Sequence, residues 1–174
     1  MITIGLRDLP SGHALREDPA LSDPSPLIRS LTRFLDRARA AVGLTGRVDV
    51  LLSTDAELRR LNRSFRGKDE ATDVLSFPAE PIPGLPSEHQ RAGDLAVSLE
   101  TAARQAEEHG HSLATELRVL LLHGLLHLQG LDHEADTGEM AARERTLRGR
   151  FRLPCTLIAR TSEFELSRAH RSAR

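Results

Sequence analysis

Apolar residues recur with two periods along this chain, and the two periods separate strands from helices. Alternating apolar and polar positions around β-branched residues predict strands at residues 1–7, 47–53, 74–78 and 94–98. Apolar positions three and four apart predict helices at residues 27–42, 54–62, 99–109, 113–128 and 134–151. Strands lie mainly in the first half and helices in the second, so we expect an α+β fold with one small mixed β-sheet of about four strands covered by helices.

Two segments lack either period. Residues 11–26 are rich in Pro, Ser, Asp and Gly, which predicts a flexible insertion. Residues 156–174 carry several arginines and serines, which predicts a basic, loosely ordered C-terminal tail. We therefore expect one domain over residues 1–155, followed by the tail.

The amino-acid composition indicates which residue types form the core and which kind of contact to a nucleic acid the chain could make. The chain of 174 residues has no Trp or Tyr and five Phe, so the core must be aliphatic. Few aromatic rings also argue against stacking of nucleic-acid bases and favour phosphate contacts. The net charge of -1 does not by itself indicate a nucleic-acid binder.

A single cysteine and the absence of long apolar runs bear on the compartment. One cysteine, Cys155, cannot form an internal disulfide, which is typical of a reducing environment. The N-terminal residues do not resemble a signal sequence, and no stretch is long and apolar enough for a membrane span. We expect a cytoplasmic protein that has no membrane partner.

Three histidines around a glycine indicate a metal site. His123 and His127 are four residues apart in a leucine-rich helical stretch, so both imidazoles leave the same helix face. Gly130 can end that helix in a left-handed conformation and return His133 toward the other two. Three imidazoles suit zinc and leave its fourth position open, which is typical of catalytic sites. We predict one zinc ion at the end of a buried helix.

A zinc peptidase is the first reaction class to test against this spacing. The HExxHxxGxxH pattern of zinc proteases places its general base, a glutamate, directly after the first histidine. Here that position is Gly124, which cannot accept a proton. The spacing therefore favours a metal ion with a different reaction.

Three blocks of sequence resemble the YbeY-type endoribonucleases, a family of bacterial rRNA maturation factors. The blocks are LNRSFRGKD at residues 61–69 continuing into TDVLSFP at 72–78, GDLAVS at 93–98, and HGLLHLQGLDHE at 123–134. The resemblance covers about residues 45–150 and leaves the insertion and the tail uncovered.

The resemblance implies a zinc-dependent endoribonuclease specific for single-stranded RNA, acting in rRNA processing at the 3′ end of 16S rRNA and in ribosome quality control. It also implies the small ribosomal subunit and an Era-type GTPase as partners, and not DNA. The family's metal ligands fall on His123, His127 and His133, and its functionally important arginine falls on Arg66. The family's usual tyrosine before the Asp-His pair is Leu131 here.

The residue chemistry assigns further roles. We predict Arg66 and His123 as catalytic residues, with Arg66 as a clamp because its planar guanidinium matches phosphate and cannot act as a base. Lys68, the only lysine, is a candidate for a second phosphate contact or a solvated loop residue. Two alternatives stay open: a noncatalytic ribosome-assembly factor with a structural zinc site, and a metal-dependent hydrolase of another substrate such as peptides.

Overall fold

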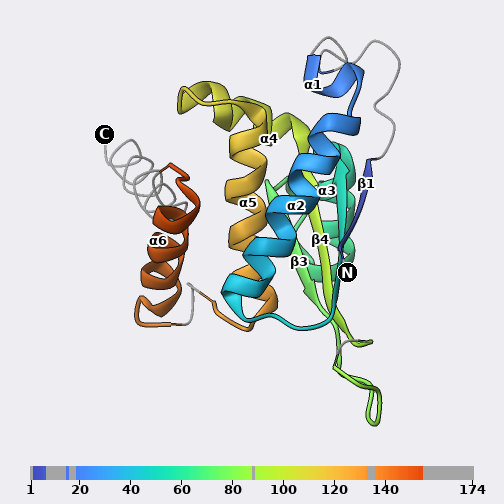
Figure 1. Cartoon of the computed structure of the whole chain (residues 1–174). Coiled ribbons are helices and arrows are strands. Elements are labelled where there is room, and N and C mark those ends of the chain that lie inside the picture. The colour runs from blue at the N-terminus through green and yellow to red at the C-terminus, as the bar shows by residue number, and fades with distance from the viewer. Residues whose placement is uncertain (1, 7–14, 16–18, 88, 133–135, 155–174) are drawn as a thin grey trace.

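The computed structural model describes residues 2–6, 15, 19–87, 89–132 and 136–154. Its strands are β1 (Ile2–Leu6), β2 (Arg47–Ser53), β3 (Val74–Pro78) and β4 (Arg91–Ser98). Its helices are α1 (Pro19–Ser22), α2 (Ser25–Val42), α3 (Asp55–Arg66), α4 (Leu99–Glu108), α5 (Leu113–Leu128) and α6 (Glu139–Phe151) (Figure 1). The predicted α+β class is confirmed.

The strands form one mixed sheet in the order β1-β2-β4-β3. β1 and β2 are parallel, as are β2 and β4, whereas β3 and β4 are antiparallel neighbours joined by a hairpin connection. The side chain of Gln90 closes that connection by donating to the carbonyl oxygens of Ile82 and Leu85, each at 2.7 Å. This topology leaves β3 at an edge of the sheet.

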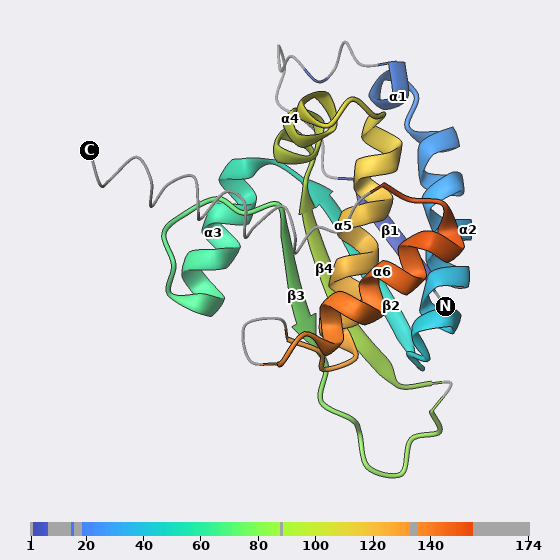
Figure 2. The same cartoon turned by 90° about the vertical axis from the view of Figure 1, so that its left-hand side faces the viewer.

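Helices cover both faces of the sheet. α2 and α5 pack side by side on one face, and α6 packs against α5 from outside. α3 packs against β3 and β4 on the other face, so α3 and α5 lie on either side of the edge strand (Figure 2). Only strand β3 therefore separates α3 from α5 at this edge of the sheet.

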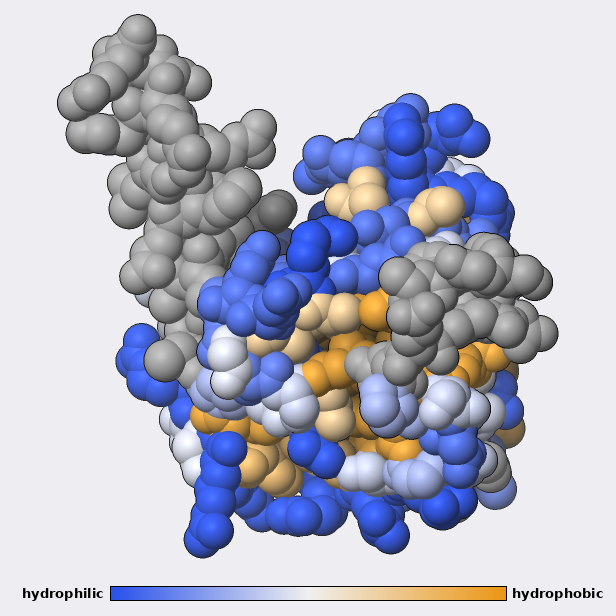
Figure 3. Space-filling view, turned by 90° about the horizontal axis from the view of Figure 1, so that it is seen from above, coloured by the Kyte–Doolittle hydropathy of each residue, from blue (hydrophilic) through white to orange (hydrophobic). Residues whose placement is uncertain are grey.

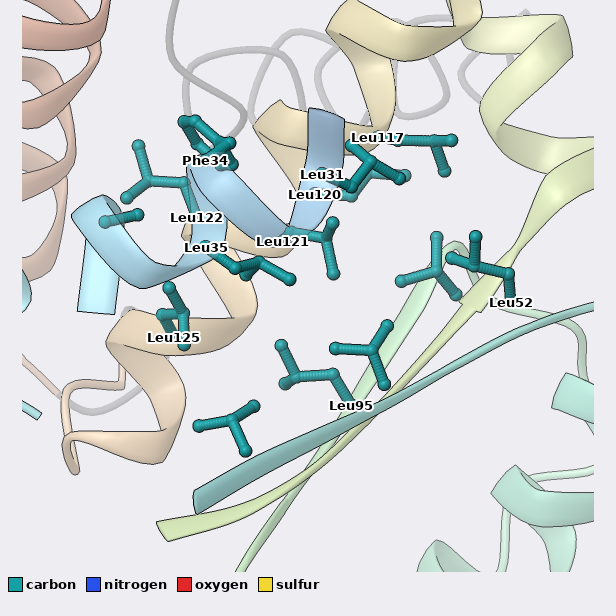
Figure 4. Close-up of a cluster of buried hydrophobic side chains, with 14 of the residues drawn as sticks. Leu31, Phe34, Leu35, Leu52, Leu95, Leu117, Leu120, Leu121, Leu122 and Leu125 are labelled. Atoms are coloured by element: carbon teal, nitrogen blue, oxygen red, sulfur yellow. The ribbon is translucent and has the colours of Figure 1, made fainter. Parts of the chain in front are cut away.

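The core is aliphatic, as predicted. Leucines of α2 and α5 meet leucines of the sheet, and most are inaccessible to solvent (Figure 4). α5 is buried on nearly every side, in keeping with its leucine-rich sequence. The helix that carries two of the predicted ligands is therefore also the centre of the core.

Several boundaries differ from the predicted ones. α3 continues to Arg66, where Gly67 ends it with a φ of 70°. α2 begins at Ser25 because proline is tolerated in the first turn of a helix, and α1 lies in the segment predicted as an insertion. α6 begins at Glu139 and not at residue 134. Residues 11–14, 16–18 and the tail predicted at 156–174 lie outside the described residues.

One face of the molecule shows both hydrophilic and apolar residues. Seen from above, hydrophilic residues form the rim, and apolar residues show toward the middle of that face (Figure 3). No helix in the described part of the chain has both the length and the apolar character needed to cross a bilayer.

Candidate functional site

His123 and His127 lie one turn apart near the C-terminal end of α5. Ser112 starts this helix by accepting a hydrogen bond from the backbone N–H of Thr115 at 3.2 Å. His123 is buried at 5% exposure and His127 is half-buried. Their Nε2 atoms are 3.1 Å apart, and the rings meet at 77°. The structure thus brings two of the three predicted ligands together at their coordinating atoms.

This spacing fits a shared metal ion. Two nitrogens bound to tetrahedral zinc at its usual bond length lie about 3.3 Å apart, close to the observed separation. Gly130 has a φ of 93°, and the N–H of Leu131 donates to the carbonyl of Leu126 at 3.1 Å, so the chain reverses directly after α5. His133 lies outside the described residues, and among the described residues no third histidine, cysteine or carboxylate completes a ligand set.

A buried carboxylate from α6 stands behind His123. Oε2 of Glu144 is 3.4 Å from Nδ1 of His123, and Oε1 accepts from Nε of Arg148 at 2.7 Å and from its Nη2. Glu144 is inaccessible to solvent, and Arg148 is 2% exposed. Both oxygens of the buried carboxylate therefore have a partner, His123 for Oε2 and Arg148 for Oε1.

The charge state of Glu144 determines whether Nδ1 of His123 donates or accepts in the hydrogen bond between them. Burial by itself raises the pKa of Glu144, but the hydrogen bond with His123 and the cation of Arg148 outweigh it and hold the pKa below its ordinary value. An ionised carboxylate only accepts hydrogen bonds, so Nδ1 of His123 must be the donor. In the neutral imidazole the remaining nitrogen, Nε2, is then the one without a proton, and it lies toward His127, as a metal-binding imidazole requires.

Gly124 lies where α5 touches the sheet. A Cβ at this position would be 2.8 Å from Cδ2 of Leu95 and 3.3 Å from Oγ of Ser76. The same Ser76 hydroxyl donates to the carbonyl of Gly124 at 3.3 Å. The position that holds the glutamate of zinc proteases therefore has no room for one and faces away from open space, which argues against peptidase chemistry of that type.

Arg66 and Lys68 lie apart from the histidines in the fold. Arg66 is the last residue of α3, and Lys68 follows the terminating Gly67; both are exposed. Within the described part of the chain neither makes a hydrogen bond or an ion pair, whereas Arg59 of the same helix binds both oxygens of Asp69 at 2.8 and 3.0 Å. The two cations are therefore available to a ligand, although no contact within the described residues joins them to the histidine pair.

Sequence reasoning gave no role to Glu144 or Arg148. A signal was present, because Glu144 shares the spacing of the inward positions Met140 and Leu147 on α6. A carboxylate in an otherwise apolar helix face requires a buried partner, which the sequence did not identify. The partner is His123, 21 residues away along the chain.

Comparisons with known proteins indicate the family of this chain. The family model described as Endoribonuclease YbeY matches residues 22–152. The Endoribonuclease YbeY of Koribacter versatilis is 52% identical over 146 residues, which cover 84% of this chain and 91% of that protein. The Endoribonuclease YbeY of Helicobacter pylori strain 26695 is 40% identical over 130 residues, with 75% and 89% covered.

A solved structure is also similar. It is a solution structure from Thermotoga maritima, 27% identical, with a TM-score of 0.47 and coverage of 87% of this chain and 92% of that one. The family model and the sequence relatives span most of this chain and most of each relative. This chain therefore belongs to the YbeY endoribonuclease family.

Proposed function

We propose that this protein is a zinc-dependent endoribonuclease that cleaves single-stranded RNA in the processing of ribosomal RNA, at the 3′ end of 16S rRNA and in ribosome quality control. The observation that carries the proposal is the pair of Nε2 atoms 3.1 Å apart on His123 and His127, with Glu144 behind Nδ1 of His123. In a member of an endoribonuclease family, such a pair supports a catalytic metal ion.

His123, His127 and His133 would hold one zinc ion. Glu144 keeps Nδ1 of His123 protonated and fixes the orientation of the ring, while Arg148 keeps the carboxylate ionised. When bound, zinc would supply Lewis acidity toward a phosphate oxygen. The protein's own contribution is a pair of imidazoles whose Nε2 atoms lie close together, one of them hydrogen-bonded at its other nitrogen to Glu144.

Arg66 and Lys68 would bind phosphates of the RNA. Both are exposed cations without a protein partner among the described residues, so phosphate binding requires no existing ion pair to break. The guanidinium of Arg66 can donate two parallel hydrogen bonds to one phosphate, whereas Lys68 acts as a point charge. The small ribosomal subunit and an Era-type GTPase are proposed partners, with the cytoplasm as the proposed location.

The test is cleavage of a single-stranded RNA oligonucleotide by highly purified protein. His127→Ala should abolish cleavage, and Arg66→Ala should slow it by about 10²- to 10³-fold, the usual effect of removing one donor to a transition-state anion. Chelator should stop the wild type and added zinc should restore it. Arg33→Ala removes an exposed arginine of α2 and controls for the loss of one positive charge.

The contrary result would be equal cleavage by wild type and both site variants. It would indicate a contaminating ribonuclease and favour the noncatalytic assembly factor. Co-sedimentation of the protein with small ribosomal subunits would then test that alternative.

A further inference from the structure

Phe65 is the most exposed large apolar side chain that the structure describes. It is 69% exposed, followed by Ile82 at 57% and Leu85 at 36%. A single exposed apolar residue is common on protein surfaces and needs no explanation. Phe65 differs because of its surroundings: a ring that supports it, cations beside it and the histidine helix across one strand.

Phe77 supports the ring of Phe65 from one side and leaves most of the ring exposed to solvent. It meets Phe77 of β3 in a T-shaped arrangement, with the ring centroids 5.1 Å apart and the ring planes at 64°. Phe77 in turn packs against a small cluster formed by Leu58, Leu75 and Ala96 between α3 and the sheet. Phe65 lies outside that cluster, so its support is fixed while most of its surface stays open.

Unpartnered positive charge adjoins the ring. Arg66 follows Phe65 directly, and Lys68 follows after one glycine; neither has a hydrogen bond or ion pair in the described structure. Two other arginines of α3 are engaged, because Arg59 binds Asp69 and Arg60 binds Glu57. Two exposed cations without a protein partner among the described residues therefore lie at the C-terminal end of α3, where the exposed ring is.

Strand β3 lies between the ring of Phe65 and helix α5, which carries the histidines. Successive side chains of a strand point to opposite faces, so Phe77 faces α3 whereas Ser76 faces α5. Ser76 donates to the carbonyl of Gly124, the residue after His123. Because β3 is an edge strand with α3 on one face and α5 on the other, a single strand separates the helix of Phe65 from the helix of the histidines.

We propose that Phe65 is a stacking site for an unpaired base of the RNA substrate, with Arg66 and Lys68 holding the adjacent phosphates. The inference rests on the proposed function, since it takes RNA as the ligand. A base inside a duplex has its faces covered by neighbouring pairs, whereas a base in a single strand can stack on an aromatic ring of any suitable site. Phe65 is therefore a determinant of preference for single-stranded RNA.

The chain offers an unusually clean probe, because it contains no tryptophan. Phe65→Trp introduces the only one. In the presence of chelator, which prevents cleavage, single-stranded oligoadenylate should quench its fluorescence, whereas inorganic polyphosphate should not. Ile82→Trp, at the second most exposed apolar position, is the matched control and should respond to neither.

Affinity measurements provide the second test. Phe65→Ala should weaken binding of single-stranded RNA by about 5- to 150-fold, the effect of losing one base–aromatic stack, and leave duplex binding unchanged. Phe65→Tyr should restore tight binding, and Ile82→Ala should have no effect. In cleavage assays the loss should raise KM more than it lowers kcat. The high exposure of Phe65 makes a folding defect of Phe65→Ala a minor concern, and circular dichroism would check it.

Two outcomes would overturn the inference. One is wild-type affinity of Phe65→Ala for single-stranded RNA, including the case in which this variant loses binding to a protein partner instead. The other is equal quenching of Phe65→Trp by polyphosphate and by RNA. Either can occur while cleavage persists, so the stacking site can fail while the proposed function stands. Conversely, stacking without cleavage would support the inference and refute the proposed activity.

Discussion

Replacing Gly124 by alanine would test whether α5 is packed against the sheet as closely as the structure indicates. Alanine in a helix interior is favoured over glycine by about 1 kcal/mol. Opposing this, the new Cβ would be 2.8 Å from Cδ2 of Leu95, which is 1% exposed and cannot move into solvent. Overpacking of this kind costs about 1–3 kcal/mol, so we expect a net destabilisation of up to about 2 kcal/mol.

Gly149→Ala is the matched control. Gly149 is also helical, in α6, but nothing lies within 4 Å of its would-be Cβ. Here the helix preference acts alone, and we expect stabilisation by about 0.5–1 kcal/mol. The two variants make the same chemical change and should shift stability in opposite directions.

Thermal unfolding followed by circular dichroism would measure both. In a domain of this size a change of 1 kcal/mol moves Tm by about 2–4 °C, so the two variants should differ by several degrees, with Gly124→Ala the lower. A Gly124→Ala variant as stable as Gly149→Ala would refute the close packing of α5 on the sheet. It would also show that the position after His123 has room for a larger side chain.

Two further predictions concern the carboxylates. Glu144→Gln should lower zinc affinity by about 10- to 100-fold, because the ionised carboxylate that accepts the hydrogen bond from His123 is lost. Competition with a chromogenic chelator would measure the affinity, and Glu139→Gln of the same helix is the control. Unchanged zinc affinity of Glu144→Gln would contradict the orienting role of Glu144. The pKa of Asp55 lies below its ordinary 3.8, because hydrogen bonds from Ser98 and Thr101 outweigh the effect of burial. The ionised Asp55 therefore stabilises the fold at pH values above 3.8. This stabilisation is lost as the pH falls through the lower pKa of Asp55 in the folded state. Asp55→Asn should therefore reduce Tm at pH 7 and have a progressively smaller effect on acidification below about pH 3.8, whereas a constant difference would exclude the ionised carboxylate as the cause.

Local periodicity made much of the fold predictable. The leucine spacing predicted a helix at residues 113–128, and α5 occupies this range; its cap Ser112 and the cap Ser98 of α4 each bond to a backbone N–H three residues along the chain. The two neighbouring short strands predicted at residues 74–78 and 94–98 form the antiparallel pair of β3 and β4. The spacing of His123 and His127 likewise needed only a helix to bring their rings together.

Features that depend on tertiary packing could not be predicted from the sequence. The partner of Glu144 could be known only once α6 was placed against α5. The shortage of aromatic residues argued against base stacking, but a count cannot reveal that Phe65 is exposed while Phe77 supports it. The later start of α6 reflects Gly138, whose φ of 109° begins the helix after a tight turn that hydrophobic spacing does not register.

The double role of α5 constrains how this protein can change over evolutionary time. Its leucines fill the centre of the core, and its two histidines form the candidate site, so one short segment serves both folding and chemistry. Most substitutions there would be eliminated for misfolding before any effect on activity could be selected. New specificities would arise more readily in segments at the margin of the sheet, such as the C-terminal end of α3, where a changed side chain leaves the core untouched.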